Sequence, residues 1–262
     1  MTVGHADVAD ELEDATGISV AQVNRSFGDI VALEAIDLHV SRHQRVGIVG
    51  PSGCGKSSLL ALVCGLDEPT SGSINVLGGH SAAERLASCA WMPQRDLLLP
   101  WRTVLANASL PLENKGLSKR DAYAIVEPLF ERFGLGGFEQ RFPYELSGGM
   151  RQRVSFLRTL VAGKDVLLLD EPFGALDSIT RADVQQWLRS ALDDEPRTVL
   201  LVTHDVEEAV LLSDVVVVIS PRPGRIVARI PISLAPVNTR RDAVMQPDFI
   251  AARGEVLDAL EA

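Results

Sequence analysis

Aromatic residues, cysteines and long apolar runs are all scarce in this 262-residue sequence. Aromatic side chains make up 5% of the chain, and its three cysteines, Cys54, Cys64 and Cys89, form no CxxC pair. This cysteine pattern argues against a zinc site and a disulfide scaffold, and it fits a reducing cytoplasm. The most apolar stretch, residues 215–219, is far shorter than the roughly 18–20 residues that a membrane-spanning helix needs. We therefore expect no membrane span.

Basic residues are also outnumbered, since 25 Lys and Arg stand against 35 Asp and Glu and give a formal net charge of -10. This acidic balance disfavours a nucleic-acid binder. Residues 1–17 hold part of the excess, because they contain acidic side chains but no lysine, arginine or apolar segment. They therefore lack the features of a secretory signal, and we expect a solvated, flexible acidic leader over 1–17.

From residue 18 onward, short β-branched runs alternate with longer amphipathic stretches, which is typical of an α/β protein. We expect strands of two kinds. Continuous apolar runs predict strands buried on both faces at 45–49, 166–170, 199–203 and 215–219. Alternating runs predict half-buried strands at 18–24, 35–40 and 224–230. Helical periodicity replaces these runs between Gln94 and Leu160, at 119–133 and again from Ser147. The sequence thus predicts a mostly parallel sheet, an N-terminal antiparallel β subdomain and a helical subdomain. The expected units are a domain over 18–235, its helical subdomain over about 95–160, and a tail over 236–262 with one helix at 249–260.

The run Gly50-Pro-Ser-Gly-Cys-Gly-Lys-Ser57 fits the pattern GxxxxGK[ST] between an expected buried strand and a helix over 56–64. Its glycines let successive N–H groups point inward, and the helix N-terminus adds partial positive charge for phosphates. Lys56 can reach the β- and γ-phosphates, the Ser57 hydroxyl can ligate Mg²⁺, and Ser58 can add a phosphate contact. The strand-to-helix setting disfavours the alternative, a glycine-rich turn that binds nothing. The predicted nucleotide-binding loop is Gly50, Pro51, Ser52, Gly53, Cys54, Gly55, Lys56, Ser57 and Ser58.

Two adjacent acids, Asp170 and Glu171, stand at the end of the apolar run 166–170. Ligands bind at the carboxyl ends of strands in doubly wound sheets, so both carboxylates are candidates for the site. We expect Asp170 to hold Mg²⁺ and Glu171 to polarise the water that attacks the γ-phosphate. The alternative is a strand that ends at the surface in solvated acids. Adjacent acids repel each other, and a cation between them and the phosphates would relieve this repulsion.

A third run, Leu146-Ser-Gly-Gly-Met-Arg-Gln-Arg153, lies within the expected helical subdomain. Ser147, Gly148 and Gly149 can form a second anion nest at a helix start, although an ordinary N-cap is the alternative for Ser147. The three runs together resemble the ATP-binding subunit of an ABC transporter. In that family the nest contacts the γ-phosphate of ATP held by the other protomer. The resemblance therefore implies a P-loop ATPase that works as a head-to-tail homodimer.

Four further positions match family motifs, and their roles come from the resemblance. Phe27 matches the aromatic residue that stacks on adenine, with core packing as its alternative. Gln94 matches the glutamine that senses Mg²⁺ and the γ-phosphate, and we expect it to contribute to catalysis and to the metal site. Asp177, in Ala175-Leu-Asp177, matches the loop that crosses the dimer interface. His204 matches the switch histidine that bonds the γ-phosphate and positions Glu171.

Residues 95–107 resemble an LLPW-x-x-V-x-x-N segment of the nitrate/sulfonate/taurine-type importer ATPases, and residues 220–226 resemble another run of that group. If exposed, Leu97, Pro100 and Trp101 would form an apolar dock for a cytoplasmic helix of a membrane partner. The alternative is that these side chains pack the helical subdomain.

The preferred interpretation is an ATP- and Mg²⁺-dependent ABC importer ATPase. We expect it on the cytoplasmic face of the cell membrane, where it powers uptake of a small, nitrate/sulfonate/taurine-like anion through separate permease subunits. A periplasmic or extracellular solute-binding protein would be an indirect partner, and we expect no nucleic-acid partner. The alternatives are a soluble ABC ATPase, for example in iron–sulfur assembly, and a regulatory module that no longer hydrolyses ATP.

Overall fold

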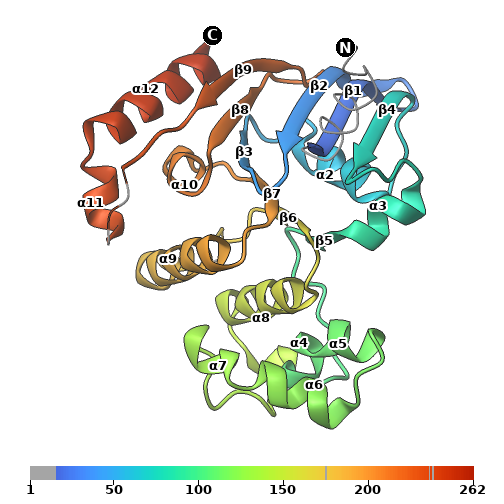
Figure 1. Cartoon of the computed structure of the whole chain (residues 1–262), viewed down its shortest axis with the longest axis vertical. Helices are drawn as coiled ribbons and strands as arrows, with labels where there is room; N and C mark the ends of the chain where they lie inside the picture. Colours follow the sequence, from blue (N-terminus) through green and yellow to red (C-terminus); the bar gives the residue numbers. More distant parts are fainter. Residues whose placement is uncertain (1–15, 175, 236, 238) are drawn as a thin grey trace, which may run out of the picture.

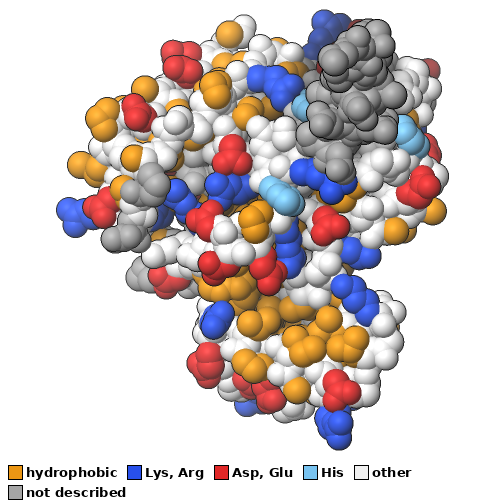
Figure 2. All heavy atoms as spheres, in the orientation of Figure 1, with side chains coloured by type: hydrophobic (Ala, Val, Ile, Leu, Met, Phe, Trp, Pro, Cys, Tyr) orange, Lys and Arg blue, Asp and Glu red, His pale blue; other side chains and the backbone are white. Residues whose placement is uncertain are grey.

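The computed structural model describes residues 16–174, 176–235, 237 and 239–262. The expected acidic leader lies outside the described residues except for Thr16 and Gly17, which begin strand β1 (Thr16–Phe27). Figure 1 shows two lobes, one containing the strands and both termini and the other built of helices. Figure 2 shows charged side chains of both signs mixed over the first lobe. Hydrophobic side chains gather on the helical lobe close to where the two lobes meet.

The strand-containing lobe holds two sheets. The first is antiparallel with the order β2-β1-β4, and the second has the order β5-β6-β7-β3-β8-β9. In the second sheet β8 and β9 pair antiparallel and the other neighbours run parallel. This arrangement confirms the predicted fold class. The strands beyond β1 are β2 (Ile30–Ser41), β3 (Arg45–Val49), β4 (Ser71–Val76), β5 (Cys89–Met92), β6 (Val166–Asp170), β7 (Thr198–Val202), β8 (Val215–Ile219) and β9 (Ile226–Pro231).

Strand side chains alternate between two hydrophobic clusters on opposite faces of the six-stranded sheet. Val46 and Ile48 of β3 join α2 and the antiparallel sheet, whereas Val49 joins the cluster that contains α10, α12 and the helical lobe. This two-sided burial explains the continuous apolar runs of the central strands. The helices of this lobe are α2 (Lys56–Cys64), α3 (Ala82–Ser88), α9 (Ser178–Asp194), α10 (Val206–Leu212), α11 (Arg240–Val244) and α12 (Pro247–Glu261).

The helical lobe lies between β5 and β6 in the chain, so both of its connections start from adjacent strands. The helical periodicity predicted at 119–133 corresponds to two helices, because Pro128 has no N–H for the carbonyl four residues earlier. In the described part of the chain, no helix has the length and hydrophobicity needed to cross a membrane. The helices of this lobe are α4 (Val104–Ala108), α5 (Leu110–Asn114), α6 (Lys119–Val126), α7 (Leu129–Arg132), a 3-10 turn (Pro143–Glu145) and α8 (Gly148–Val161).

Candidate nucleotide-binding site

The loop between β3 and α2 has the backbone shape of a phosphate cradle. Gly53 and Gly55 adopt positive φ angles of 76° and 105°. A Cβ atom on Gly55 would lie 2.6 Å from Cδ2 of Leu33, so only glycine fits there. Because Gly55 is also the N-cap of α2, no cap side chain competes for the first-turn N–H groups. The start of α2 thus combines available donors with the positive end of the helix dipole.

Lys56 is nearly buried beside this loop, with 7% of the residue exposed. Its ammonium group donates hydrogen bonds to the carbonyl oxygens of Gly50 at 2.7 Å and Pro51 at 2.9 Å. A buried ammonium needs such partners, since its desolvation is otherwise costly. The loop thereby holds a positive charge at the rim of the predicted phosphate site.

The two acids at the end of β6 differ in environment. Asp170 is 3% exposed, and burial raises its pKa. A hydrogen bond with Ser57 opposes this rise, whereas the neighbouring charge of Glu171 adds to it. Glu171 is partly exposed and has a positive φ of 49°, which is uncommon for a side chain of this size and costs about 1–3 kcal/mol. Such strained backbone occurs preferentially at functional sites.

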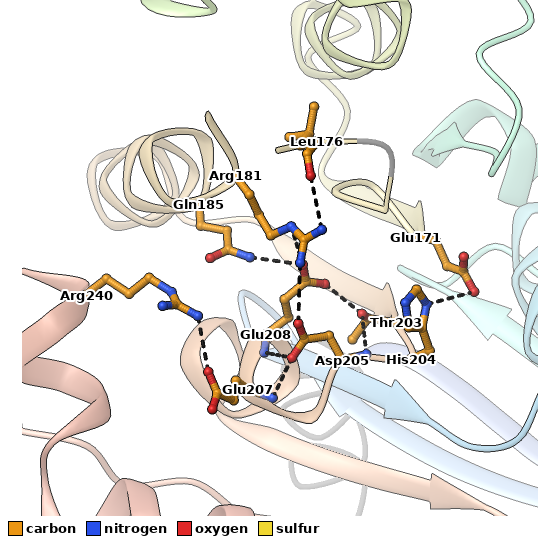
Figure 3. Close-up of polar contacts among 10 residues, drawn as sticks. All are labelled: Glu171, Leu176, Arg181, Gln185, Thr203, His204, Asp205, Glu207, Glu208 and Arg240. Carbon is orange, nitrogen blue, oxygen red and sulfur yellow. Dashed lines mark hydrogen bonds and ion pairs between the residues drawn. The ribbon is translucent and has the colours of Figure 1, made fainter. Parts of the chain in front are cut away.

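Each carboxylate oxygen of Glu171 faces a different predicted catalytic residue. Oε2 accepts a hydrogen bond of 2.9 Å from the side-chain amide of Gln94. Oε1 lies 3.5 Å from Nδ1 of His204, as Figure 3 shows. The backbone N–H of Glu171 donates to the carbonyl of Val202 at 2.8 Å. The carboxylate therefore lies between Gln94, which follows β5, and His204, which follows β7.

A cavity of about 440 Å³ brings most of the predicted residues together. The predicted residues that line it are Phe27, Ser52, Gly53, Gly55, Lys56, Ser57, Ser58, Gln94, Asp170 and Glu171. Of the remaining loop positions, Gly50 and Pro51 supply the carbonyls that bind Lys56. Cys54 is buried, with Sγ 3.8 Å from the Lys56 ammonium.

Arg222 also lines this cavity, although no predicted site residue corresponds to it. Its guanidinium donates from Nη2 at 2.8 Å and Nε at 3.2 Å to the carbonyl of Gly53. Gly224 donates to the carbonyl of Ala32 at 3.0 Å, and a Cβ atom there would lie 2.2 Å from the carbonyl oxygen of Cys54. The run at 220–226 therefore packs directly on the phosphate-binding loop.

Phe27 stands at one wall of the cavity with 48% of the residue exposed, so it is not a core side chain. The guanidinium carbon of Arg25 lies 4.4 Å from the centre of its ring, within cation–π range. Arg25 is held in turn by Asp67, at 2.7 Å. The ring is thus supported on the Arg25 side, an arrangement that suits stacking on a flat base.

The predicted LSGG nest and crossing loop do not line this cavity. Ser147 caps α8 and accepts a hydrogen bond of 3.3 Å from the N–H of Met150, and Gly148 and Gly149 begin the helix. Asp177 caps α9 in the same way through the N–H of Thr180 at 3.0 Å. Ala175 lies outside the described residues. Ser147 is therefore an N-cap, the alternative considered for it. The N–H groups of Gly148 and Gly149 lie at the first positions of the helix.

The expected docking segment is exposed but rigidly held. Leu97 and Trp101 are 60% and 72% exposed, and Pro100 is exposed as well. Arg158 of α8 donates to the carbonyls of Asp96 at 2.7 Å and Leu97 at 2.9 Å.

A second arginine of α8 also holds this segment. Arg151 donates from Nε to the Asp96 carboxylate at 3.0 Å and from Nη1 to the carbonyl of Leu146 at 2.9 Å. Since Leu146 immediately precedes Ser147, the segment at 96–101 and the LSGG nest are joined through α8.

The phosphate cradle, the acids at the end of β6 and the parallel sheet define a P-loop ATPase. The profile of the ABC transporter family matches residues 33–174, and the chain belongs to this family. It is an ABC-type ATPase that binds ATP.

Several curated relatives cover most of the chain. The taurine import ATP-binding protein TauB of Yersinia pestis is 40% identical over 86% of this chain and 90% of its own length. The aliphatic sulfonates import ATP-binding protein SsuB 1 of Rhodococcus jostii is 46% identical over 78% and 79%. The formylaminopyrimidine import ATP-binding protein ThiZ of Halalkalibacterium halodurans is 45% identical over 73% and 74%.

Solved structures show the same fold. The dimeric bacterial ABC transporter cassette MJ0796 superposes with a TM-score of 0.77 at 28% identity, over 82% of this chain and 99% of that chain. A dimeric post-hydrolysis state of the same cassette, bound to ADP and Pi, has a TM-score of 0.75 with the same coverage. These similarities confirm the family resemblance.

Proposed function

We propose that the protein is the ATP-hydrolysing subunit of an ABC importer of the taurine/sulfonate type, and that it powers uptake of a small anionic solute through a separate permease. The observation that carries this proposal is the Glu171 carboxylate, held between Gln94 and His204 at the mouth of the phosphate cradle. The names of the relatives supply the direction of transport and the solute class.

The residues at the end of β6 fit Mg²⁺, which prefers oxygen ligands. The Asp170 carboxylate and the Ser57 hydroxyl are hydrogen-bonded to each other, and Glu171 places a second negative charge beside them. Ser57, Gln94 and Asp170 would hold the ion together with the nucleotide phosphates. When bound, Mg²⁺ would neutralise charge that develops on the transferred phosphoryl group. It would also favour the ionised form of Asp170 against the effect of burial.

Hydrolysis then depends on positioning by the chain's own groups. Lys56 and the first-turn N–H groups of α2 bind the phosphates, and Phe27 stacks on the adenine ring. Glu171 accepts a hydrogen bond from the attacking water and so polarises it toward the γ-phosphate. Gln94 donates a hydrogen bond to one oxygen of Glu171 and His204 lies 3.5 Å from the other, so both side chains would orient the carboxylate. His204, with 64% of its side chain exposed, can also reach the γ-phosphate.

The protein would act as a homodimer in which each LSGG nest completes the partner's site. Support comes from the position of Ser147, Gly148 and Gly149 outside the nucleotide cavity and from the dimeric structural neighbour. Asp177 would lie at the interface between the two protomers. Two ATP molecules would be enclosed by closure of the dimer, and hydrolysis would release it through charge repulsion.

The permease would dock at Leu97, Pro100 and Trp101, placing the subunit at the cytoplasmic face of the membrane as a peripheral protein. Support comes from the exposure of these three side chains and from their rigid attachment to α8. An exposed apolar group on a well-held backbone is typical of a protein interface. The solute-binding protein would contact only the permease.

A pull-down from gently solubilised native membranes, followed by mass spectrometry, tests this proposal. We expect the tagged protein to recover a small permease with several membrane spans of roughly 20 residues each. Trp101→Ala should lose the permease, whereas Ile125→Ala, which also truncates a half-exposed apolar side chain of the helical lobe, should retain it. Recovery of soluble partners alone, with ATPase activity intact, would overturn the importer assignment and favour a soluble ABC ATPase.

A further inference from the structure

We propose that Arg181 is a positioning residue that couples the predicted crossing loop to the switch histidine, so that partner contact at Asp177 sets the geometry of His204. The inference rests on the proposed homodimer. It adds a residue to the reaction that neither the motifs nor the comparisons identify.

Arg181 lies in the first turn of α9 and contacts two separate segments. Its Nη2 donates a hydrogen bond of 3.1 Å to the carbonyl of Leu176, next to Asp177. On its other side, Nη1 lies 3.7 Å from the Asp205 carboxylate and Nε lies 3.9 Å from the Glu208 carboxylate. Figure 3 shows this guanidinium between the Leu176 carbonyl and the start of α10.

The two carboxylates that face Arg181 fix the backbone on both sides of His204. Glu208 is 4% exposed and accepts a hydrogen bond of 2.6 Å from the Thr203 hydroxyl. The same hydroxyl accepts from the N–H of Asp205 at 3.0 Å. The Asp205 carboxylate caps α10 by accepting from the N–H groups of residues 207 and 208. His204 thus lies between two residues that are both tied to the Arg181 partners.

These contacts form a ring that returns to the catalytic carboxylate. From Glu171 the chain leads to Leu176, whose carbonyl binds Arg181. Arg181 pairs with Asp205, which is adjacent to His204, and His204 lies 3.5 Å from Glu171. A displacement of the crossing loop would therefore move a guanidinium that lies within 4 Å of both carboxylates that anchor the His204 segment. One of them, Glu208, also accepts a hydrogen bond of 3.0 Å from Gln185. The distance between His204 and Glu171 would respond directly.

An arginine suits this role because its planar fork presents several N–H groups in fixed directions. One guanidinium can reach a carbonyl and two carboxylates together, whereas a lysine ammonium is a single point of charge. Arg240 offers a matched contrast within the same region. It pairs with Glu207, at 3.3 Å, on the opposite side of α10 from His204 (Figure 3).

The experiment compares purified full-length wild type with Arg181→Ala, Arg181→Lys and Arg240→Ala, measuring kcat, KM, ATP affinity and Tm. We expect Arg181→Ala to lower kcat about ten- to a hundredfold while KM and ATP affinity change less than about twofold, since small displacements of catalytic groups have effects of this size. Arg181→Lys should have a Tm close to that of the wild type, but its kcat should stay as low as that of Arg181→Ala. Arg240→Ala should leave kcat close to the wild-type value.

The same substitutions in a His204→Ala background separate positioning from general stabilisation. If Arg181 acts through His204, Arg181→Ala should lower kcat less than about twofold further in that background, because the two effects are not additive. An equal loss of kcat in both backgrounds would overturn the inference, as would an unchanged kcat or full rescue by Arg181→Lys.

Failure of the proposed function is distinguishable from failure of this inference. If the wild-type protein hydrolyses ATP but does not dimerise when ATP is added, the proposed homodimer fails, whatever the effect of Arg181→Ala. If wild type dimerises with ATP and depends on Glu171 and His204, but not on Arg181, the present inference alone fails.

Discussion

Gln94 donates a hydrogen bond of 2.9 Å to Glu171, across 77 residues of sequence. Gln94 follows β5 where the chain enters the helical lobe, and Glu171 follows β6, the parallel neighbouring strand that comes after this lobe in the chain. The pair therefore connects the entrance of the helical lobe to the carboxyl end of β6. A movement of this lobe would therefore act on the carboxylate that we assign to catalysis.

Glu171→Gln should lower kcat at least about 100-fold, because an amide accepts a proton far less readily than a carboxylate. ATP affinity should change little, since Gln can still bond to Gln94 and the cradle is intact. Phosphate release and equilibrium nucleotide binding measure the two effects. Glu127→Gln, which removes an exposed charge in the helical lobe, is the matched control. Wild-type turnover in Glu171→Gln would remove the residue from the mechanism.

Lys56→Ala should weaken ATP binding itself. A hydrogen bond to a charged group contributes about 1.5–3 kcal/mol, which corresponds to about a ten- to hundredfold loss of affinity. Isothermal titration with ATP and Mg²⁺ measures this change. Lys164→Ala provides the control, because that ammonium donates to the carbonyl of Ala87 away from the cavity. An unchanged dissociation constant in Lys56→Ala would contradict the assignment of the cradle.

Ser147→Arg should leave ATP binding to each monomer intact and prevent closure of the dimer. A long cationic side chain would block the nest that we assign to the partner's γ-phosphate. Light scattering with ATP, in a Glu171→Gln background that retains the nucleotide, reports closure. Ser118→Arg removes an equivalent cap from α6, where the hydroxyl accepts from Asp121 at 3.2 Å. Each change should cost about 1 kcal/mol of helix stability. Normal dimerisation in Ser147→Arg would refute the nest.

Glu208→Gln should change the pH dependence of stability. Burial raises the pKa of the Glu208 carboxyl above its ordinary value of 4.5, although the Thr203 hydroxyl opposes this shift. The folded protein thus holds this proton more tightly than the unfolded chain, so wild type loses stability as pH rises from about 4.5 through the raised pKa. Glutamine cannot ionise, so Tm of the variant minus Tm of wild type should increase from pH 5 to pH 8. A decrease over this range would contradict the shift.

The central sheet could be predicted because its strands are buried on both faces and therefore read as unbroken apolar runs. β6 at Val166–Asp170 and β8 at Val215–Ile219 have the predicted bounds. β4 escaped prediction, since its sequence SGSINV is rich in Ser and Gly and it is stabilised by pairing with β1. β5 has only four residues, Cys89–Met92, too few for a pattern. The tail likewise contains α11 before the predicted helix, which extends over Pro247–Glu261.

The cradle and the acid pair could be predicted from motifs because each is a local run of residues. Contacts that depend on backbone carbonyls left no such pattern. Arg222 binds the carbonyl of Gly53, and Arg181 binds the carbonyl of Leu176. A carbonyl is present at every residue, so the sequence does not mark which one is the partner. The run at 220–226 could be named only from its family resemblance, and that resemblance did not predict its contact with the cradle.

The segment at 96–101 and the start of α8 are fastened together by Arg151 and Arg158. A force applied at Leu97 would therefore act on α8 close to the end of the helix that carries the LSGG nest. The subunit would then respond to the direction in which it is pushed, and a partner could read or drive its nucleotide state mechanically.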